Sequence, residues 1–410
     1  MIMTKLNTWS RLMLCGLLTS TLAWQPGVVA FAGQEPQTHN ATYRVLEPIE
    51  SGNVTLYPIV RVHADDRAAH WHYLTLDQGL KSGEVVITEA GKARGLVRSR
   101  GGVRGEVTES LAGGGDEVNK LVLVNSSSHP LVLLAGEIVT GGKQDRVIAK
   151  DRIVPPHSAP LDLGVFCIEP GRWVERSAKF GIVGKSGHTS FMVEPSVRRK
   201  AMAAQDQHEV WAAVGSSIGS GAARPASPAR LDSVYSGDGI AYDRPAVTSS
   251  YAEAMAAPQA QAEVDRVAAP AVGENNEVME KLRKEQVVGV VAAIDGHIVW
   301  ADVFASSEML ADYWTKLVRS YAAEAIHRDT HDGPAASKEA ALQFLSEVAG
   351  GDETSEGKTA VYRYREVQGP RESLFVLEAL FPGTGFEVHR TKLVQSHASS
   401  RNDKKEFHIY

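Results

Sequence analysis

The pattern of apolar positions predicts that the first half of the chain is mostly β-structure. Short apolar runs recur there, and most of them end in turn residues such as Gly, Ser, Asn or Pro. The predicted strands span residues 54–62, 85–88, 120–125, 131–135, 138–140, 146–149, 153–154 and 165–168. Frequent short strands of this kind favour an antiparallel sandwich or a barrel-like sheet over alternating strands and helices.

Helical signals are few in this half of the chain. Thr75 is a candidate N-cap for a short helix that follows it. A second helix is predicted over residues 197–214, where Met202, Val210, Trp211 and Val214 share one face. Residues 94–115 are rich in glycine and arginine and are expected to form a loop.

A β-hairpin with a following helix is predicted at residues 286–321. Asp295 and Gly296 stand between two apolar runs, and this dipeptide is a strong hairpin signal because both turn residues need a positive φ. Ser306 or Ser307 can cap the helix that follows. A hairpin and one helix bury too little surface to fold alone, so we expect them to pack onto the first β-rich part.

The remaining segments differ in composition. Residues 215–275 are dominated by Ala, Ser, Gly and Pro and are predicted to be a disordered insertion, with short helical pieces conceivable on either side of Pro258. The C-terminal residues are predicted to form a small α+β unit. Its helix is expected at 338–348 and its strands at 359–367, 374–380 and 386–393.

The predicted fold class is therefore α+β. A β-rich antiparallel domain with a few packed helices occupies residues 33–214, and residues 276–330 complete it after the insertion. Residues 331–410 form the C-terminal α+β unit.

Residues 1–32 have the pattern of a secretory signal peptide. Lys5 and Arg11 precede or flank an apolar stretch over residues 12–24, and Ala30-Phe31-Ala32 is a typical cleavage sequence. A membrane anchor is the competing interpretation, but the apolar stretch is short and is followed by Pro and Gly. We therefore expect a periplasmic or extracellular protein without a transmembrane segment after cleavage.

Composition and charge narrow the classes of partner. The chain is 43% hydrophobic and 22% charged, with a formal net charge of -6. This acidity, without any basic stripe, argues against nucleic acid as a partner. Cleavage leaves Cys167 as the one cysteine, so an internal disulfide is excluded.

One stretch carries a family resemblance. The sequence PLVLLAGEIVTGGKQDRVIAKDRIVPPHSAPLDLGVFCIEPGRW, at residues 130–173, resembles the ARG and Rhodanese-Phosphatase-superfamily-associated protein domain. The similarity extends to residues 73–77, to 208–211 and to the predicted hairpin and helix, and thus covers about 42–327 without the insertion. The family has no established biochemistry. Its name implies a genomic association with ADP-ribosylglycohydrolases and rhodanese-phosphatase-like proteins, and assigns no catalytic residue here.

The same stretch concentrates polar residues between predicted strands. Glu137, Lys143, Gln144, Asp145 and Arg146 could form a pocket at one end of a sheet, in which the two cations hold an anionic ligand. The alternative is an internal network of ion pairs, because a carboxylate between apolar runs needs a partner when it is buried. Both interpretations remain open from the sequence.

The turn that follows adds Glu169, Arg172 and Trp173 to the candidate ligand-binding residues. Cys167 and Arg172 have the spacing of a rhodanese-type anion loop, but Pro170 removes one of the N–H donors that such a loop needs. A buried, inert Cys167 is the competing interpretation. No third ligand accompanies His70 and His72, so neither a metal site nor a cofactor is predicted.

These observations favour an exported, non-catalytic module that binds a small anionic ligand or a protein partner. The first alternative is a hydrolase of a phosphorylated or ribosylated small molecule, with Glu137 or Asp145 as the acid/base. The second is a purely structural domain.

Overall fold

The computed structural model describes residues 42–63, 67–68, 71–90, 120–170, 176–181, 192–220, 248–274, 277–328, 335–380 and 385–395. These residues belong to one unit, Asn40–Tyr410. The predicted signal peptide and the predicted loop at 94–115 lie outside the described residues, as do Arg172 and Trp173.

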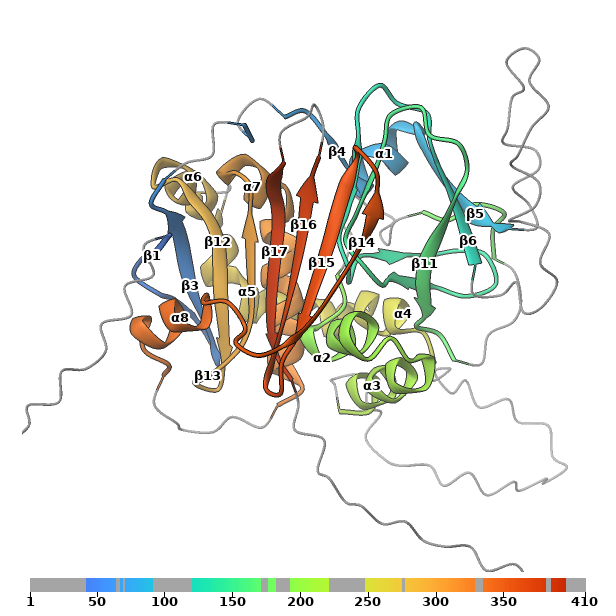
Figure 1. Ribbon diagram of the computed structural model, residues 1–410. Coiled ribbons are helices and arrows are strands. Elements are labelled where there is room, and N and C mark those ends of the chain that lie inside the picture. The colour runs from blue at the N-terminus through green and yellow to red at the C-terminus, as the bar shows by residue number, and fades with distance from the viewer. Residues whose placement is uncertain are drawn as a thin grey trace, which may run out of the picture. The chain divides into compact units, whose positions relative to one another are not determined.

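The largest element of the fold is a nine-stranded antiparallel sheet (Figure 1). Its strands follow the order β1 (Tyr43–Val45), β3 (Val54–Arg61), β12 (Val287–Ile294), β13 (His297–Phe304), β17 (Phe386–Val394), β16 (Glu372–Ala379), β15 (Tyr362–Gln368) and β14 (Asp352–Lys358). A further short strand, β2 (Ile49–Ser51), also pairs with β3. The C-terminal strands thus extend the same sheet as the N-terminal ones, because β17 pairs directly with β13.

The hairpin of β12 and β13 forms as predicted. Asp295 and Gly296 have φ values of 51° and 78°, which is the turn conformation that their sequence favours. Every residue of β12 is buried, since it lies between β3 and β13 and is covered on both faces. The predicted β-rich, antiparallel α+β fold is confirmed.

Helices cover both faces of this sheet (Figure 1). On one face, α7 (Ser307–Ile326) packs against β12 and against α5 (Pro258–Val272). On the other, α8 (Lys338–Phe344) packs against β1, and its Phe344 joins a core that includes Tyr57 and Val291. The side chain of Ser306 accepts a hydrogen bond from the Met309 N–H, which confirms the predicted N-cap of α7.

Part of the segment predicted to be disordered is ordered. Residues 251–272 form α4 (Tyr251–Ala256) and α5, and five residues of α5 are buried. Their small side chains allow α5 to lie against α7, so the composition that suggested disorder here serves helix packing. Pro258 fits because it occupies the first turn of α5. Residues 221–247 lie outside the described residues.

A second group of strands carries the polar stretch (Figure 1). One sheet has the order β5 (Val85–Glu89), β6 (Lys120–Asn125), β11 (Leu161–Cys167), β9 (Arg146–Ile148) and β8 (Ile138–Val139). A smaller sheet has the order β10 (Arg152–Val154), β7 (Leu131–Leu133) and β4 (Leu74–Thr75). The helix α1 (Leu76–Ser82) follows β4 directly in the chain. Thr75 caps α1 as predicted, with Gln78 completing the capping box.

Three helical segments replace the single helix predicted at 197–214. They are α2 (Pro195–Arg199), the π-helical turn η3 (Lys200–Ala204) and α3 (Gln207–Ser220). Gln205 adopts a positive φ of 50°, which ends the first helical stretch and lets α3 start in a new direction. Among the described residues, no helix is both long and apolar enough to cross a bilayer.

Candidate functional site

Glu137 belongs to an ion triad with the buried Lys316 and the partly exposed Asp77. Its side chain is 1% exposed, and it accepts hydrogen bonds from Lys316 Nζ of α7 at 2.7 Å and from the Leu134 N–H at 2.9 Å. Lys316 Nζ also lies 2.9 Å from Asp77 Oδ2. Burial raises the pKa of Glu137, and the Lys316 ammonium opposes that effect. The triad connects the polar stretch to α7.

Asp145 and Glu169 form a second buried cluster. Asp145 accepts hydrogen bonds from the Gly141 N–H at 3.1 Å and from Ser250 Oγ at 2.8 Å. Its own N–H donates to Glu169 Oε2 at 3.1 Å, and the Gln144 amide donates to the Glu169 carbonyl oxygen at 3.1 Å. These hydrogen bonds connect residues 141–145 to the turn after β11 and to the N-terminus of α4.

The two predicted cations have different surroundings. Arg146 is fully buried and donates to the Asp145 carbonyl oxygen at 3.3 Å. Lys143 is exposed, and its backbone N–H donates to Glu89 Oε1 at 2.8 Å. The structure thus brings Gln144, Asp145, Arg146 and Glu169 together as an internal network and places Glu137 in a separate one. Ligand binding by this loop stays a prediction.

Cys167 lies in the core beside this cluster. Its side chain is 1% exposed, and its backbone N–H donates to Gln207 Oε1 at 2.8 Å. Burial raises the pKa of the thiol, so the thiolate that an anion-loop nucleophile needs is disfavoured. These contacts support the interpretation of a structural cysteine.

A fully buried network that the sequence did not reveal lies between the two groups of strands. We call it the core network: Arg198, Asp302, His389 and Asp151. Arg198 donates to both carboxylate oxygens of Asp302 at 3.0 Å, and His389 Nε2 lies 3.2 Å from Asp302 Oδ1. His389 Nδ1 lies 2.6 Å from Asp151 Oδ2. Four distant parts of the chain therefore meet at one point.

Electrostatic contacts within the core network keep His389 and Asp302 charged. Burial alone would lower the pKa of His389, but Asp151 and Asp302 raise it to about 9. Burial alone would raise the pKa of Asp302, but Arg198 and His389 hold it far below its usual value. Tyr321 and Thr391 donate the remaining hydrogen bonds to Asp302. Each of the four residues is at most 1% exposed, so the core network lies inside the fold and not at a surface site.

A fourth polar cluster lies where α2 meets the end of α7, and we call it the junction cluster. Glu194 accepts hydrogen bonds from the hydroxyls of Ser217 and Ser196. Burial, followed by the neighbouring Glu324 carboxylate, raises the pKa of Glu194 to about 8. Its second oxygen lies 3.4 Å from His327 Nε2. A carboxyl with such a pKa is mostly protonated at neutral pH.

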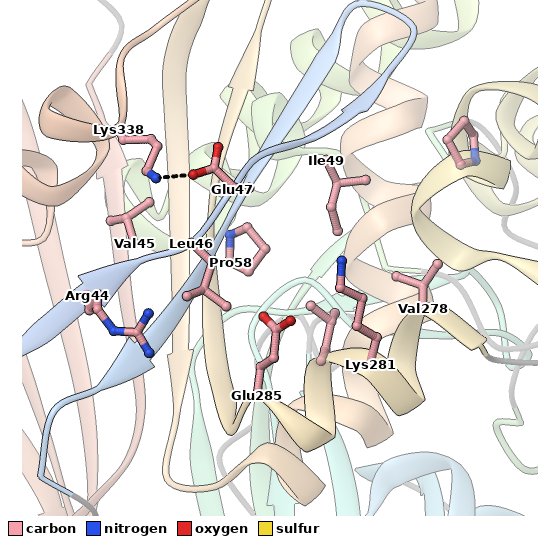
Figure 2. Close-up of a pocket in the computed structure, with 12 residues that line it drawn as sticks. Arg44, Val45, Leu46, Glu47, Ile49, Pro58, Val278, Lys281, Glu285 and Lys338 are labelled. Atoms are coloured by element: carbon pink, nitrogen blue, oxygen red, sulfur yellow. Dashed lines mark hydrogen bonds and ion pairs between the residues drawn. The ribbon is translucent and has the colours of Figure 1, made fainter.

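A groove lies at the edge of the large sheet, as Figure 2 shows. Its volume is about 480 Å³, which is within the usual range for ligand pockets. Its apolar lining consists of Val45, Leu46, Ile49, Pro58, Pro270, Val278 and Leu282. Its charged lining consists of Arg44, Glu47, Lys281, Glu285 and Lys338, from the β1–β2 segment, α6 (Glu277–Lys284), the residue after it and α8.

The β1–β2 segment is the open edge of the sheet. Within the described residues, β1 and β2 pair only with β3. The Thr42 carbonyl oxygen accepts from the N–H of Val62, the residue after β3, and the Leu46 N–H donates to the Pro58 carbonyl oxygen of β3. The two-residue alternation of an antiparallel ladder therefore directs the backbone groups of Tyr43 and Val45 away from β3. A row of backbone donors and acceptors thus lies beside the groove.

The charges of the groove are only partly neutralised. Lys338 Nζ pairs with Glu47 at 2.6 Å, as the dashed line in Figure 2 marks. The exposed side chains of Arg44 and Lys281 make no ion pair or side-chain hydrogen bond within the described part of the chain. Glu285 is the remaining carboxylate in the lining. The groove therefore has one more cation than anion.

Comparison with known proteins gives one match. A family model described as the ARG and Rhodanese-Phosphatase-superfamily-associated Protein domain matches residues 42–394. The match includes the C-terminal strands, so it is longer than the resemblance read from the sequence. No curated protein and no solved structure matches the chain. Within the described residues, no group of three or more His, Cys, Asp or Glu could hold a metal ion.

Proposed function

The chain belongs to the ARG and Rhodanese-Phosphatase-superfamily-associated protein domain family, and on that premise we propose that it is an exported, non-catalytic interaction module. It binds an extended, acidic segment of a protein partner in the groove beside β1. The partner segment adds to the large sheet as a further strand, with its side chains in the groove.

The observation that carries this proposal is the difference between the two edges of the large sheet. At one edge, all seven residues of β14 are exposed, and charged side chains such as Asp352, Glu353 and Lys358 discourage pairing with another chain. At the other edge, β1 presents free backbone groups above an apolar groove. Backbone pairing at an open edge combined with side-chain pockets is a recurrent mode of peptide recognition.

The charge of the groove supports an acidic partner segment. Arg44 and Lys281 line the groove without an ion-pair partner in the described part of the chain, and Glu285 is the one lining carboxylate besides the paired Glu47. A carboxylate of the bound segment can pair with either cation at the rim, where such pairs contribute mainly to specificity and association rate. The apolar lining supplies the burial that drives binding.

The accessibility of the acidic residues supports a non-catalytic role. The hydrolase alternative requires Glu137 or Asp145 to contact a substrate, but each is 1% exposed and is held by intramolecular hydrogen bonds. Glu194, whose pKa suits acid/base catalysis, is 2% exposed. The groove, by contrast, is lined by exposed side chains such as Arg44, Lys281 and Glu285.

The test is a selection of peptides that bind the purified protein from a library of extended decapeptides rich in Asp and Glu. Selected peptides are then measured by fluorescence anisotropy. Lys281→Glu should weaken binding about tenfold, because it replaces an attractive charge with a repulsive one. The matched control is Lys284→Glu, which makes the same change on an exposed residue of α6 outside the groove lining.

Backbone pairing has its own signature in the peptide. When the peptide residues are N-methylated one at a time, binding should be abolished at every second position, because only alternate N–H groups of an added strand face β1. Failure to select any acidic binder, or equal binding to the Lys281→Glu and Lys284→Glu variants, would refute the proposal.

A further inference from the structure

Two arginines lie close together at the junction cluster, away from the groove. Ser196 and Arg199 are one turn apart on α2, so they share a face. Glu324 and Arg328 are likewise one turn apart at the end of α7. The Ser196 N–H donates to Glu324 Oε2 at 2.8 Å, which holds the two faces against each other. Arg199 and Arg328 therefore belong to the same small region.

Arg199 has no hydrogen-bond or ion-pair partner among the described residues. Its Nε is buried without a hydrogen-bond partner, and the guanidinium makes no ion pair with any described residue. Burial lowers the pKa of Arg199, Glu324 opposes that effect, and the positive charge of Arg328 adds to it. Arg328 itself pairs with Glu324 Oε1 at 2.6 Å and is 35% exposed. A buried donor left unpaired costs free energy until something accepts from it.

Other polar atoms of the junction cluster are also unsatisfied. Both ring nitrogens of His327 and Oε2 of Glu194 are buried without a hydrogen-bond partner. Burial lowers the pKa of His327 and raises that of Glu194, so both groups are mostly neutral at pH 7. Among the described residues of the junction cluster, Glu324 is then the one negative charge beside two guanidinium groups. These described residues thus have a net positive charge and several unused hydrogen-bonding atoms.

We propose that the junction cluster binds an oxyanion, either a phosphate group or a carboxylate, between Arg199 and Arg328, with the N–H of His327 as a further donor. Two guanidinium groups form the planar, multidentate donor set that such anions require. The bound anion neutralises the excess charge and satisfies the buried Nε of Arg199. This site is separate from the groove and does not depend on the proposed function.

The test is a titration of the purified protein with inorganic phosphate, and separately with acetate, by isothermal calorimetry at constant ionic strength. The response to each anion decides which source of the oxyanion the site prefers. Arg199→Gln and Arg328→Gln should each weaken binding about tenfold or more, because each removes a charge-assisted hydrogen-bond donor. The control is Arg266→Gln, an exposed arginine at 67% that pairs only along its own helix.

A second readout does not depend on heat signals. The NMR titration of the His327 ring should show a higher pKa with phosphate present, because a bound anion favours the imidazolium form. That increase should be absent in Arg199→Gln. If that variant fails to fold, Arg328→Gln decides, since Arg328 is partly exposed. The inference is wrong if wild-type protein binds neither anion, if the arginine variants bind as tightly as Arg266→Gln, or if the His327 pKa does not change.

Discussion

The core network allows a quantitative prediction for the variant Asp302→Asn. The substitution keeps the shape of the side chain but removes its charge. It leaves the guanidinium of Arg198 and the imidazolium of His389 beside a neutral amide, in a place where no side chain is more than 1% exposed. Breaking a buried ion pair by removing one partner costs about 3–5 kcal/mol. We expect a loss of stability of that size.

The assay is equilibrium unfolding in urea at pH 6, where His389 is charged. A matched control is Asp162→Asn, which changes an exposed residue and should alter stability by no more than about 0.5 kcal/mol. The double variant Asp302→Asn with Arg198→Met should be at least about 1 kcal/mol more stable than the sum of the single effects, because the second change removes the stranded cation. A loss below about 1 kcal/mol for Asp302→Asn, or strict additivity, would refute the reasoning.

Further predictions concern pH, the ion triad and processing. The pKa of His389 is raised from 6.5 to about 9 in the folded state. Its contribution of about 3 kcal/mol to the free energy of unfolding is therefore complete below pH 6.5 and is lost as the pH rises through 9. Urea unfolding of His389→Gln, measured over the same pH range, should lack this pH dependence. The pKa of Glu194 is raised from 4.5 to about 8, so stability also falls between these pH values, and Glu194→Gln should flatten that interval in the same assay. Lys316→Met should lower the free energy of unfolding by about 3–5 kcal/mol, and adding Glu137→Gln should restore part of that loss. A double variant that is no more stable than Lys316→Met would contradict the ion pair between Lys316 and Glu137. If residues 1–32 are a cleaved signal peptide, as the sequence predicts, mass spectrometry of the protein from its native host should find Gly33 as the first residue. An intact N-terminus would exclude cleavage.

Local signals in the sequence predicted local structure well. Asp295 and Gly296 specify their turn by the conformation that each residue tolerates, and the capping of α1 by Thr75 depends on residues three positions away. Such features need no knowledge of the rest of the chain. For residues 251–272 the sequence allowed only short helical pieces on either side of Pro258 within a disordered insertion, because the stability of α5 depends on α7, about fifty positions further on.

Long-range pairing is the part that the sequence could not reveal. Arg198 and Asp302 are 104 positions apart, and Asp151 and His389 are 238 positions apart, with no local motif at any of the four. The groove likewise depends on packing between distant segments, because its lining combines the β1–β2 segment with α6 and α8. For Glu137, the alternative of an internal network could be stated from its apolar neighbours, but its partner Lys316 could not be named.

The pairing of β17 with β13 has a consequence for synthesis. While the ribosome is still short of residue 386, β13 has one unpaired edge, and Asp302 lacks the donors that Thr391 and His389 provide. The nascent protein therefore cannot complete its main sheet until Val394, the end of β17, has been made. A premature stop codon that removes only β17 is expected to eliminate the whole fold rather than trim it, since the exposed strand edge then promotes aggregation.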